Sequence, residues 1–129
     1  MDGRLVLLGL IVVLAVVVMR DMEPARSAAQ LARDRAVDAV LVEVDRTQLC
    51  YRRRRDRYAE TIPSLQFAGG SFMRTALSHD LDIHIEVRGD GYQQRITGEG
   101  VEAVLERRGG ELVRLSVGDR AAPRPAAGC

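Results

Sequence analysis

The sequence predicts an α+β protein: a long N-terminal helix, first transmembrane and then amphipathic, packed on a four-stranded antiparallel sheet. Three observations lead to this prediction. Residues 5–19 form an uncharged run that is apolar on every helical face. Apolar side chains then recur at three- and four-residue steps through residues 37–51, which is the period of a helix. From Leu81 the period changes to two residues, as in a half-buried strand.

The run from Leu5 to Met19 has no charged or hydrogen-bonding side chain, and Arg4 and Arg20 bracket it. A helix that packs on a soluble core needs only one apolar stripe, whereas a membrane helix is apolar all round. The run would extend about 22 Å as a helix, and the arginines can reach the interfaces of a hydrocarbon layer of about 30 Å. We therefore expect a transmembrane anchor over residues 1–20. The positions assigned to the membrane span are Leu5, Leu8, Gly9, Ile11, Val12, Leu14, Ala15 and Val18.

A cleaved secretory signal and a helix buried within a complex are the alternatives for this run. The residues at its end, from Val17 to Asp21, lack the small side chains of a signal cleavage site. A retained anchor is therefore the preferred interpretation.

Length, charge and cysteine content limit the class of protein. The 129 residues allow one domain, and a net charge of +1 gives no global attraction to nucleic acid. Two cysteines are too few for a disulfide framework. Cys50 lies roughly opposite the apolar helical stripe and Cys129 lies in a tail, so we expect idle thiols, with a crosslink between subunits as the alternative.

Residues 21–58 are expected to form the amphipathic helical spine. Pro24 either bends the axis or occupies the first turn of a new helix. From Ala25 to Arg57 there is no glycine or proline, and good helix formers dominate. A helix with an apolar stripe needs a cover in water, and the adjacent sheet provides one. The residues expected to form the helix–sheet packing are Val37, Leu41, Val44, Tyr51, Ile83 and Ile85.

The segment 59–80 is expected to be a connecting loop. Pro63 indicates a turn and Gly69–Gly70 a second break, while residues 73–77 form at most one short helical turn.

Residues 81–118 are expected to form the antiparallel sheet. Glycine-containing turns at 89–91, 98–100 and 109–110 separate four strands, which is the pattern of a meander. The proline- and alanine-rich residues 119–129 predict a disordered tail.

The densest charge run is Arg52, Arg53, Arg54 and Arg55, followed by Asp56. Contact with a polyanion, either nucleic acid or anionic lipid, is one interpretation. The plainer one is a solvated helix C-terminus, where cations favour the helix dipole. Four consecutive helical residues fan around about 300°, so they do not form one flat surface.

The row of acidic and histidine side chains in the first strand is the second charged cluster. Asp80, Asp82, His84 and Glu86 would share one strand face, which could hold a divalent ion or could simply be the wet face of the sheet. We take the second interpretation and expect no metal and no cofactor. The sequence contains no phosphate-binding, zinc-protease, C-x-x-C or G-x-S-x-G motif, so we expect no enzymatic activity and no small-molecule substrate.

The order of these elements resembles the type IV pilin and type II secretion pseudopilin family. Pro24 lies just beyond the apolar run, where pilin helices often bend. Tyr51 and Tyr58, followed by Ile62-Pro63-Ser64-Leu65, are similar to the passage that closes the long helix of many pseudopilins. Asp90-Gly91-Tyr92 is similar to the hairpin entry of their sheets.

The resemblance implies a membrane-anchored structural subunit of a type IV pilus or secretion-type filament. It implies a single span of the bacterial inner (cytoplasmic) membrane, with the sheet domain outside the cytoplasm. The partners would be membrane lipid and like subunits or related pilins. The competing class is a single-pass membrane accessory or binding protein that does not polymerise.

The chain departs from the processing signature of this family. Gly3 is followed by Arg4 where the family has an aromatic residue, and the fifth position after Gly3 is Leu8 where the family has glutamate. These residues fit a pilin-like protein that stays uncleaved, a chain whose start lies elsewhere, or an unrelated anchored domain of similar shape.

The arginines that flank the run bear on orientation. Counted alone, they favour a cytoplasmic sheet domain, because only Arg4 precedes the span and more arginines follow it than precede it. We expect the outward orientation from the architecture.

Overall fold

The computed structural model describes residues 27–67 and 70–129. The chain divides into two compact units, Met1–Ala32 and Arg33–Cys129, and the first is described only from residue 27. The predicted membrane anchor over residues 1–20 therefore lies outside the described residues. Of the helices that are described, none combines the length and the apolar character that a membrane span requires.

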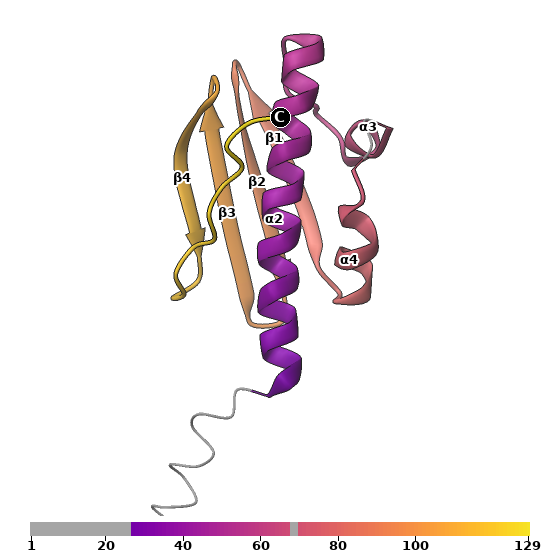
Figure 1. Ribbon diagram of the computed structural model, residues 1–129, viewed down its shortest axis with the longest axis vertical. Helices are drawn as coiled ribbons and strands as arrows, with labels where there is room; N and C mark the ends of the chain where they lie inside the picture. The colour runs from indigo at the N-terminus through magenta and orange to yellow at the C-terminus, as the bar shows by residue number, and fades with distance from the viewer. Residues whose placement is uncertain (1–26, 68–69) are drawn as a thin grey trace, which may run out of the picture. The chain divides into compact units, whose positions relative to one another are not determined.

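A long helix and a four-stranded antiparallel sheet form the described fold, which confirms the α+β prediction in this part (Figure 1). The helix α2 spans Ala28–Arg55. The strands lie in sequence order, each antiparallel to the next, so the sheet is a simple meander. Their bounds are Asp82–Arg88 for β1, Gly91–Gly98 for β2, Val101–Arg108 for β3 and Glu111–Val117 for β4.

Two-residue turns join the strands, and each contains a glycine with positive φ. Gly89, Gly100 and Gly109 have φ values of 58°, 69° and 59°, a backbone conformation that residues with a Cβ rarely adopt. The helix α2 ends in a similar way, because Asp56 takes φ of 59° and donates its N–H to the Arg52 carbonyl at 2.7 Å.

The core lies between α2 and one face of the sheet. Val37, Leu41 and Val44 are fully buried on the sheet side of α2. Tyr51, Ile83 and Ile85 are partly buried and pack against this core. The residues expected at the helix–sheet interface thus lie there.

The segment expected to be a loop contains two short helices, α3 over Ile62–Phe67 and α4 over Phe72–Ser78. Proline is tolerated in the first turn of a helix, and Pro63 takes that place in α3, where the Thr61 hydroxyl accepts the Ser64 N–H at 3.3 Å. Leu65 and Phe72 are fully buried, so packing stabilises helices whose sequences are short and weakly periodic.

Candidate functional site

A buried ion pair joins α2 to the sheet. Asp45 of α2 is fully buried and Arg107 of β3 is 6% exposed. The Arg107 Nε and Nη2 atoms donate to the two oxygens of the Asp45 carboxylate at 2.6 and 2.7 Å. The Tyr92 hydroxyl of β2 donates to the same carboxylate at 2.6 Å. A charge pair withdrawn from water is stable only when its hydrogen-bonding groups are occupied, and this one meets that condition.

The rest of the Arg107 guanidinium binds backbone carbonyls from two other segments. Its Nη1 donates to the Gly110 carbonyl at 2.9 Å and its Nη2 to the Ala126 carbonyl at 3.0 Å. Arg107 thereby connects α2, the β3–β4 turn and the C-terminal segment. Its charge is satisfied within the protein, so it is not free to bind a ligand.

The strand register brings the members of this cluster together. Tyr92 lies opposite Arg107 in the β2–β3 ladder, and the register of the β3–β4 ladder shifts between Glu106 and Arg107. Gly91 precedes Tyr92, and a Cβ at Gly91 would lie 2.6 Å from the Arg107 carbonyl oxygen. Glycine is therefore required for the close approach of the two backbones here.

Burial and neighbouring charge shift the ionisation of this cluster. Burial, and then the Asp45 carboxylate, raise the pKa of Tyr92 well above its usual 10.0. Burial also raises the pKa of Tyr58, against the opposing effect of the Arg52 and Arg107 charges. The hydrogen bonds that Arg107 donates to the Asp45 carboxylate raise the pKa of Arg107. The two tyrosines therefore stay neutral and Arg107 stays charged. In this protonation state the cluster can hold α2 to the sheet.

Two buried glutamines continue the polar contacts on either side of Asp45. Gln48 accepts the Ala59 N–H at 2.8 Å and donates to the Ala59 carbonyl at 2.9 Å, so it fixes the chain where it leaves α2. Gln94 donates to the Leu41 carbonyl at 2.9 Å, and its buried Oε1 has no partner among the described residues.

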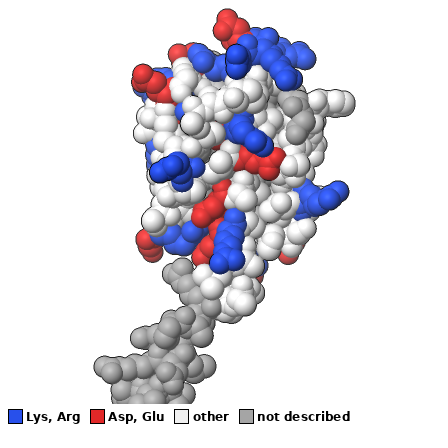
Figure 2. Space-filling model, in the orientation of Figure 1, with Lys and Arg blue, Asp and Glu red and all other residues white. Residues whose placement is uncertain are grey.

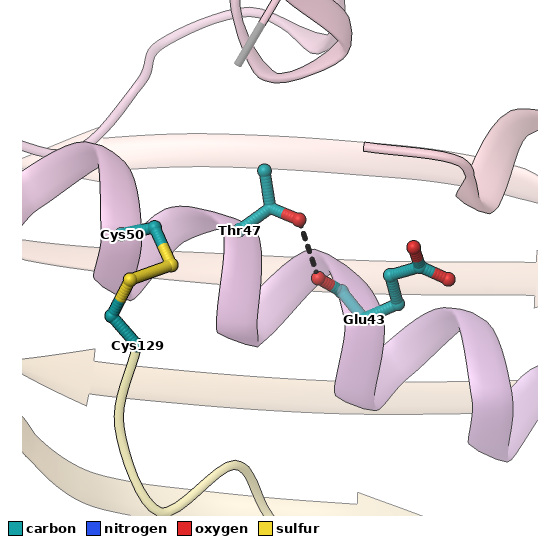
Figure 3. The surroundings of a disulfide bond; sticks show 4 residues. All are labelled: Glu43, Thr47, Cys50 and Cys129. Carbon is teal, nitrogen blue, oxygen red and sulfur yellow. Dashed lines mark hydrogen bonds between the residues drawn. A yellow bond between two sulfur atoms is a disulfide. The ribbon is translucent and has the colours of Figure 1, made fainter. Parts of the chain in front are cut away.

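The C-terminal segment is held against α2 by a disulfide bond (Figure 3). Cys50 and Cys129 are joined, so the interpretation of idle thiols or of a crosslink between subunits is wrong. The sequence placed Cys50 on the side of α2 opposite its apolar stripe, and Cys129 at the end of the C-terminal segment reaches it there. Figure 3 also shows Thr47 donating to the Glu43 carbonyl at 2.8 Å, one turn back along α2.

Residues 119–129, whose composition predicts disorder, have a defined course on the β4 side of α2 (Figure 1). Arg120, the second residue of this segment, donates to the Asp38 carboxylate at 3.0 Å, and its Nε lies 3.5 Å from the Asp34 carboxylate. The hydrogen bond to Ala126 and the disulfide hold the remainder. This segment has few apolar side chains to bury, so hydrogen bonds, ion pairs and the disulfide hold it in place instead.

The predicted polyanion contacts gather at the end of the molecule where α2 ends, which Figure 2 shows as a cluster of basic side chains. Arg53, Arg54 and Arg55 are exposed, whereas Arg52 is half-buried. The Arg52 guanidinium lies 5.6 Å from the Tyr58 ring centre and that of Arg55 lies 5.5 Å from the Tyr51 ring centre. Two arginines of the run therefore lie over aromatic rings, and the other two make no side-chain hydrogen bond, ion pair or ring contact among the described residues.

The outer face of the sheet carries the other predicted charged cluster. His84 and Glu86 alternate with the inward residues of β1 and are exposed. Across residues 27–67 and 70–129, no group of three His, Cys, Asp or Glu side chains could hold a metal ion. A shallow hollow of about 230 Å³ opens beside Gly91, and its lining includes Glu86, Arg88, Glu106 and Arg108. Its mixed charges select no single ligand class.

Sequence reasoning missed the buried tie among Asp45, Tyr92 and Arg107. One signal was present: Asp45 lies one residue after Val44 and three before Gln48, within the buried part of the helix. A carboxylate beside an apolar stripe predicts either an exposed flank or a buried partner, and only the fold decides between them.

Comparison with protein-family models, curated proteins and solved structures finds no match for this chain.

Proposed function

We propose that this chain is a membrane-anchored, pilin-like structural subunit of a type IV pilus or secretion-type filament. One observation carries the proposal: α2, which follows the apolar run in the sequence, lies along a four-stranded meander with one stripe buried. This is the order of anchor, spine and sheet that the resemblance implies. The proposed mechanism is mechanical, with the anchor held in lipid until assembly transfers it into a bundle of like anchors.

Close packing between anchors would determine the affinity of assembly. Lipid chains are as apolar as the anchor, so helix association in a bilayer depends on close contact rather than on a hydrophobic drive. Gly9 and Ala15 are the small residues of the run and would allow such contact.

The Cys50–Cys129 disulfide supports an orientation with the sheet domain outside the cytoplasm. Disulfides persist in oxidising compartments and are rare in the reducing cytosol. This argument opposes the arginine count around the run, and we give it more weight because the bond is a contact within the folded unit.

A single-pass accessory protein that does not polymerise is the second candidate. The run from Leu5 to Met19 contains no acidic residue, whereas the family has a glutamate that aligns neighbouring subunits. A chain without this residue could keep the anchor and the fold while lacking the filament contact.

Substitution within the anchor tests the filament proposal. In cells that produce the native protein, Val12→Arg should abolish chemical crosslinking into higher-order assemblies, and Val12→Leu should preserve it. The sheet domain should keep its disulfide in both variants, which shows that folding is intact. A native protein that fractionates with membranes but crosslinks only as a monomer would support the accessory protein and reject the filament.

Thiol trapping and N-terminal sequencing test orientation and retention of the anchor. Native protein quenched in acid and treated with a maleimide polymer should gain no label until it is reduced. Labelling of both cysteines without a reductant would place the sheet domain in the cytoplasm. A mature N-terminus beyond Met19 would reject the retained anchor.

A further inference from the structure

We propose that the end of the molecule where α2 terminates binds the phosphate backbone of duplex DNA without reading its bases. This arginine end consists of Arg52, Arg53, Arg54, Arg55, Arg57 and Arg108. The inference is independent of filament assembly, because it concerns only the folded unit.

The first support is the distribution of ion pairs. Across the described residues, Arg33, Arg46, Arg95, Arg107 and Arg120 each have an acidic partner within 4.0 Å. No member of the arginine end has one, although the net charge of the chain is only +1. The other described arginines without an ion pair lie singly on α2, α4, β4 and the C-terminal segment, whereas those of the arginine end lie together.

The second support is that three segments of the chain build this end. The Gly109 N–H donates to the Asp90 carbonyl at 3.0 Å, so the β1–β2 and β3–β4 turns lie against each other. Cβ atoms built on Gly109 and Gly110 would lie 4.0 and 3.6 Å from the Arg52 guanidinium nitrogens. The end of α2 therefore rests on the two turns, and Arg108 stands beside them.

The third support is the pre-arrangement of two guanidinium groups. Arg52 and Arg55 lie over the rings of Tyr58 and Tyr51, which limits their rotamers before any ligand binds. A guanidinium can donate two parallel hydrogen bonds to a phosphate, which makes arginine well suited to phosphodiesters. Asp56, Asp90 and Glu111, which lies opposite Arg108 in the β3–β4 ladder, also lie at this end and moderate its charge.

The geometry favours a nucleic acid backbone over a membrane surface. Consecutive helical residues fan around about 300°, so these arginines cannot all meet one plane, whereas a grooved duplex presents phosphates on several sides. Arg52 and Arg55 lie over the rings of Tyr58 and Tyr51, so these two rings are not free to stack on a base. Recognition would therefore be electrostatic and independent of base sequence.

The test measures fluorescence anisotropy of a labelled random-sequence duplex with the full chain in a non-ionic detergent. We expect binding that weakens as salt rises, with a slope in the log–log plot of about −0.9 for each phosphate contact. The variant Arg53→Gln/Arg54→Gln/Arg57→Gln should bind about tenfold more weakly or worse, with a slope shallower by roughly 2 to 3.

The control variant is Arg35→Gln/Arg74→Gln/Arg124→Gln, which removes the same charge from exposed arginines elsewhere in the fold. It should keep the affinity and the slope within about twofold of the unsubstituted chain, if contacts and not net charge carry binding. Circular dichroism and the intact disulfide show that both variants are folded.

Three results would overturn the proposal: no duplex binding at low salt, equal losses in the two variants, or preference for anionic vesicles over DNA. The vesicles contain phosphatidylglycerol in phosphatidylcholine. Failure here leaves the crosslinking test of the filament unaffected, and failure of that test leaves this one unaffected.

Discussion

Arginine side chains occupy two opposite environments in this protein: Arg107 is buried, and most of the arginine end is exposed. Arg107 is 6% exposed, and a carboxylate and two backbone carbonyls occupy its guanidinium. Arg53 and Arg54 are exposed and have no partner among the described residues. A buried guanidinium requires a complete set of acceptors, whereas an exposed one is solvated by water and remains able to bind a partner.

The difference teaches where arginine determines the fold of this protein and where it does not. Removal of a partner from Arg107 leaves a charge in a site that water does not reach. Removal of Arg53 leaves only a slightly less basic surface. The following predictions test this contrast, from the largest expected effect to the smallest.

Asp45→Ala should lower the free energy of unfolding by about 3–5 kcal/mol, because it strands the Arg107 charge in the interior. Urea denaturation followed by circular dichroism measures the loss. The control is Asp38→Ala, which breaks a half-exposed pair with Arg120 and should cost less than about 1 kcal/mol. The double variant Asp45→Leu/Arg107→Met should regain most of the stability, since an apolar pair can replace a buried ion pair. Equal losses for Asp45→Ala and Asp38→Ala would contradict the comparison.

Cys50→Ser/Cys129→Ser should lower the free energy of unfolding by about 2–4 kcal/mol. The bond closes a sequence separation of 79 residues and thus restricts the unfolded chain. Reduction of the unsubstituted protein should reproduce the loss, and the double variant should be insensitive to the reductant. The idea fails if reduction leaves the urea midpoint unchanged.

Alkaline pH should destabilise the fold through Tyr92. Its pKa is raised in the folded state, so above about pH 10 the unfolded chain loses this proton first and binds fewer protons than the folded one. Stability is therefore fully present below pH 10 and declines as pH rises toward the folded-state pKa of Tyr92. Tyr92→Phe should cost about 1.5 kcal/mol at neutral pH, through the lost hydrogen bond to Asp45. It should leave only the weaker alkaline decline that Tyr58 produces, because the pKa of Tyr58 is raised as well.

Tyr51→Phe serves as the control for this titration, because the Tyr51 hydroxyl has no hydrogen bond among the described residues. Urea midpoints measured between pH 8 and pH 11 should then follow those of the unsubstituted protein. A steep alkaline decline in Tyr92→Phe as well would assign the effect to other groups.

Arg53→Gln should change the free energy of unfolding by less than about 0.5 kcal/mol, as expected for an exposed side chain without partners. The same urea measurement detects it, and Arg54→Gln provides a replicate. A decrease of more than about 1 kcal/mol in the free energy of unfolding would show that the arginine end contributes to the stability of the fold, which would contradict the contrast with Arg107.

Local patterns in the sequence were enough to predict the helix and the sheet. The stripe that contains Val37, Leu41 and Val44 and the alternation through Ile83 and Ile85 depend only on the periods of a helix and a strand. The order of the strands followed from two-residue turns, which leave little freedom except to pair neighbours. The transmembrane anchor predicted over residues 1–20 lies outside the described residues and stays a prediction.

Contacts between residues distant in sequence could not be predicted in the same way. Asp45 and Arg107 are 62 residues apart, and nothing local distinguishes this pair from the exposed charges around it. The helices α3 and α4 and the course of residues 119–129 have the same origin, since tertiary packing and a disulfide hold segments whose own sequences are weakly structured.

The sequence by itself thus determined the type of each main element and the apolar face that each one buries, because backbone geometry imposes those periods wherever the segment lies. Only the tertiary structure decided which charges are buried and which are free, because the free energy of an ion depends on every group around it. For an arginine-rich chain, that distinction separates the residues that hold the fold together from the residues that can bind a partner.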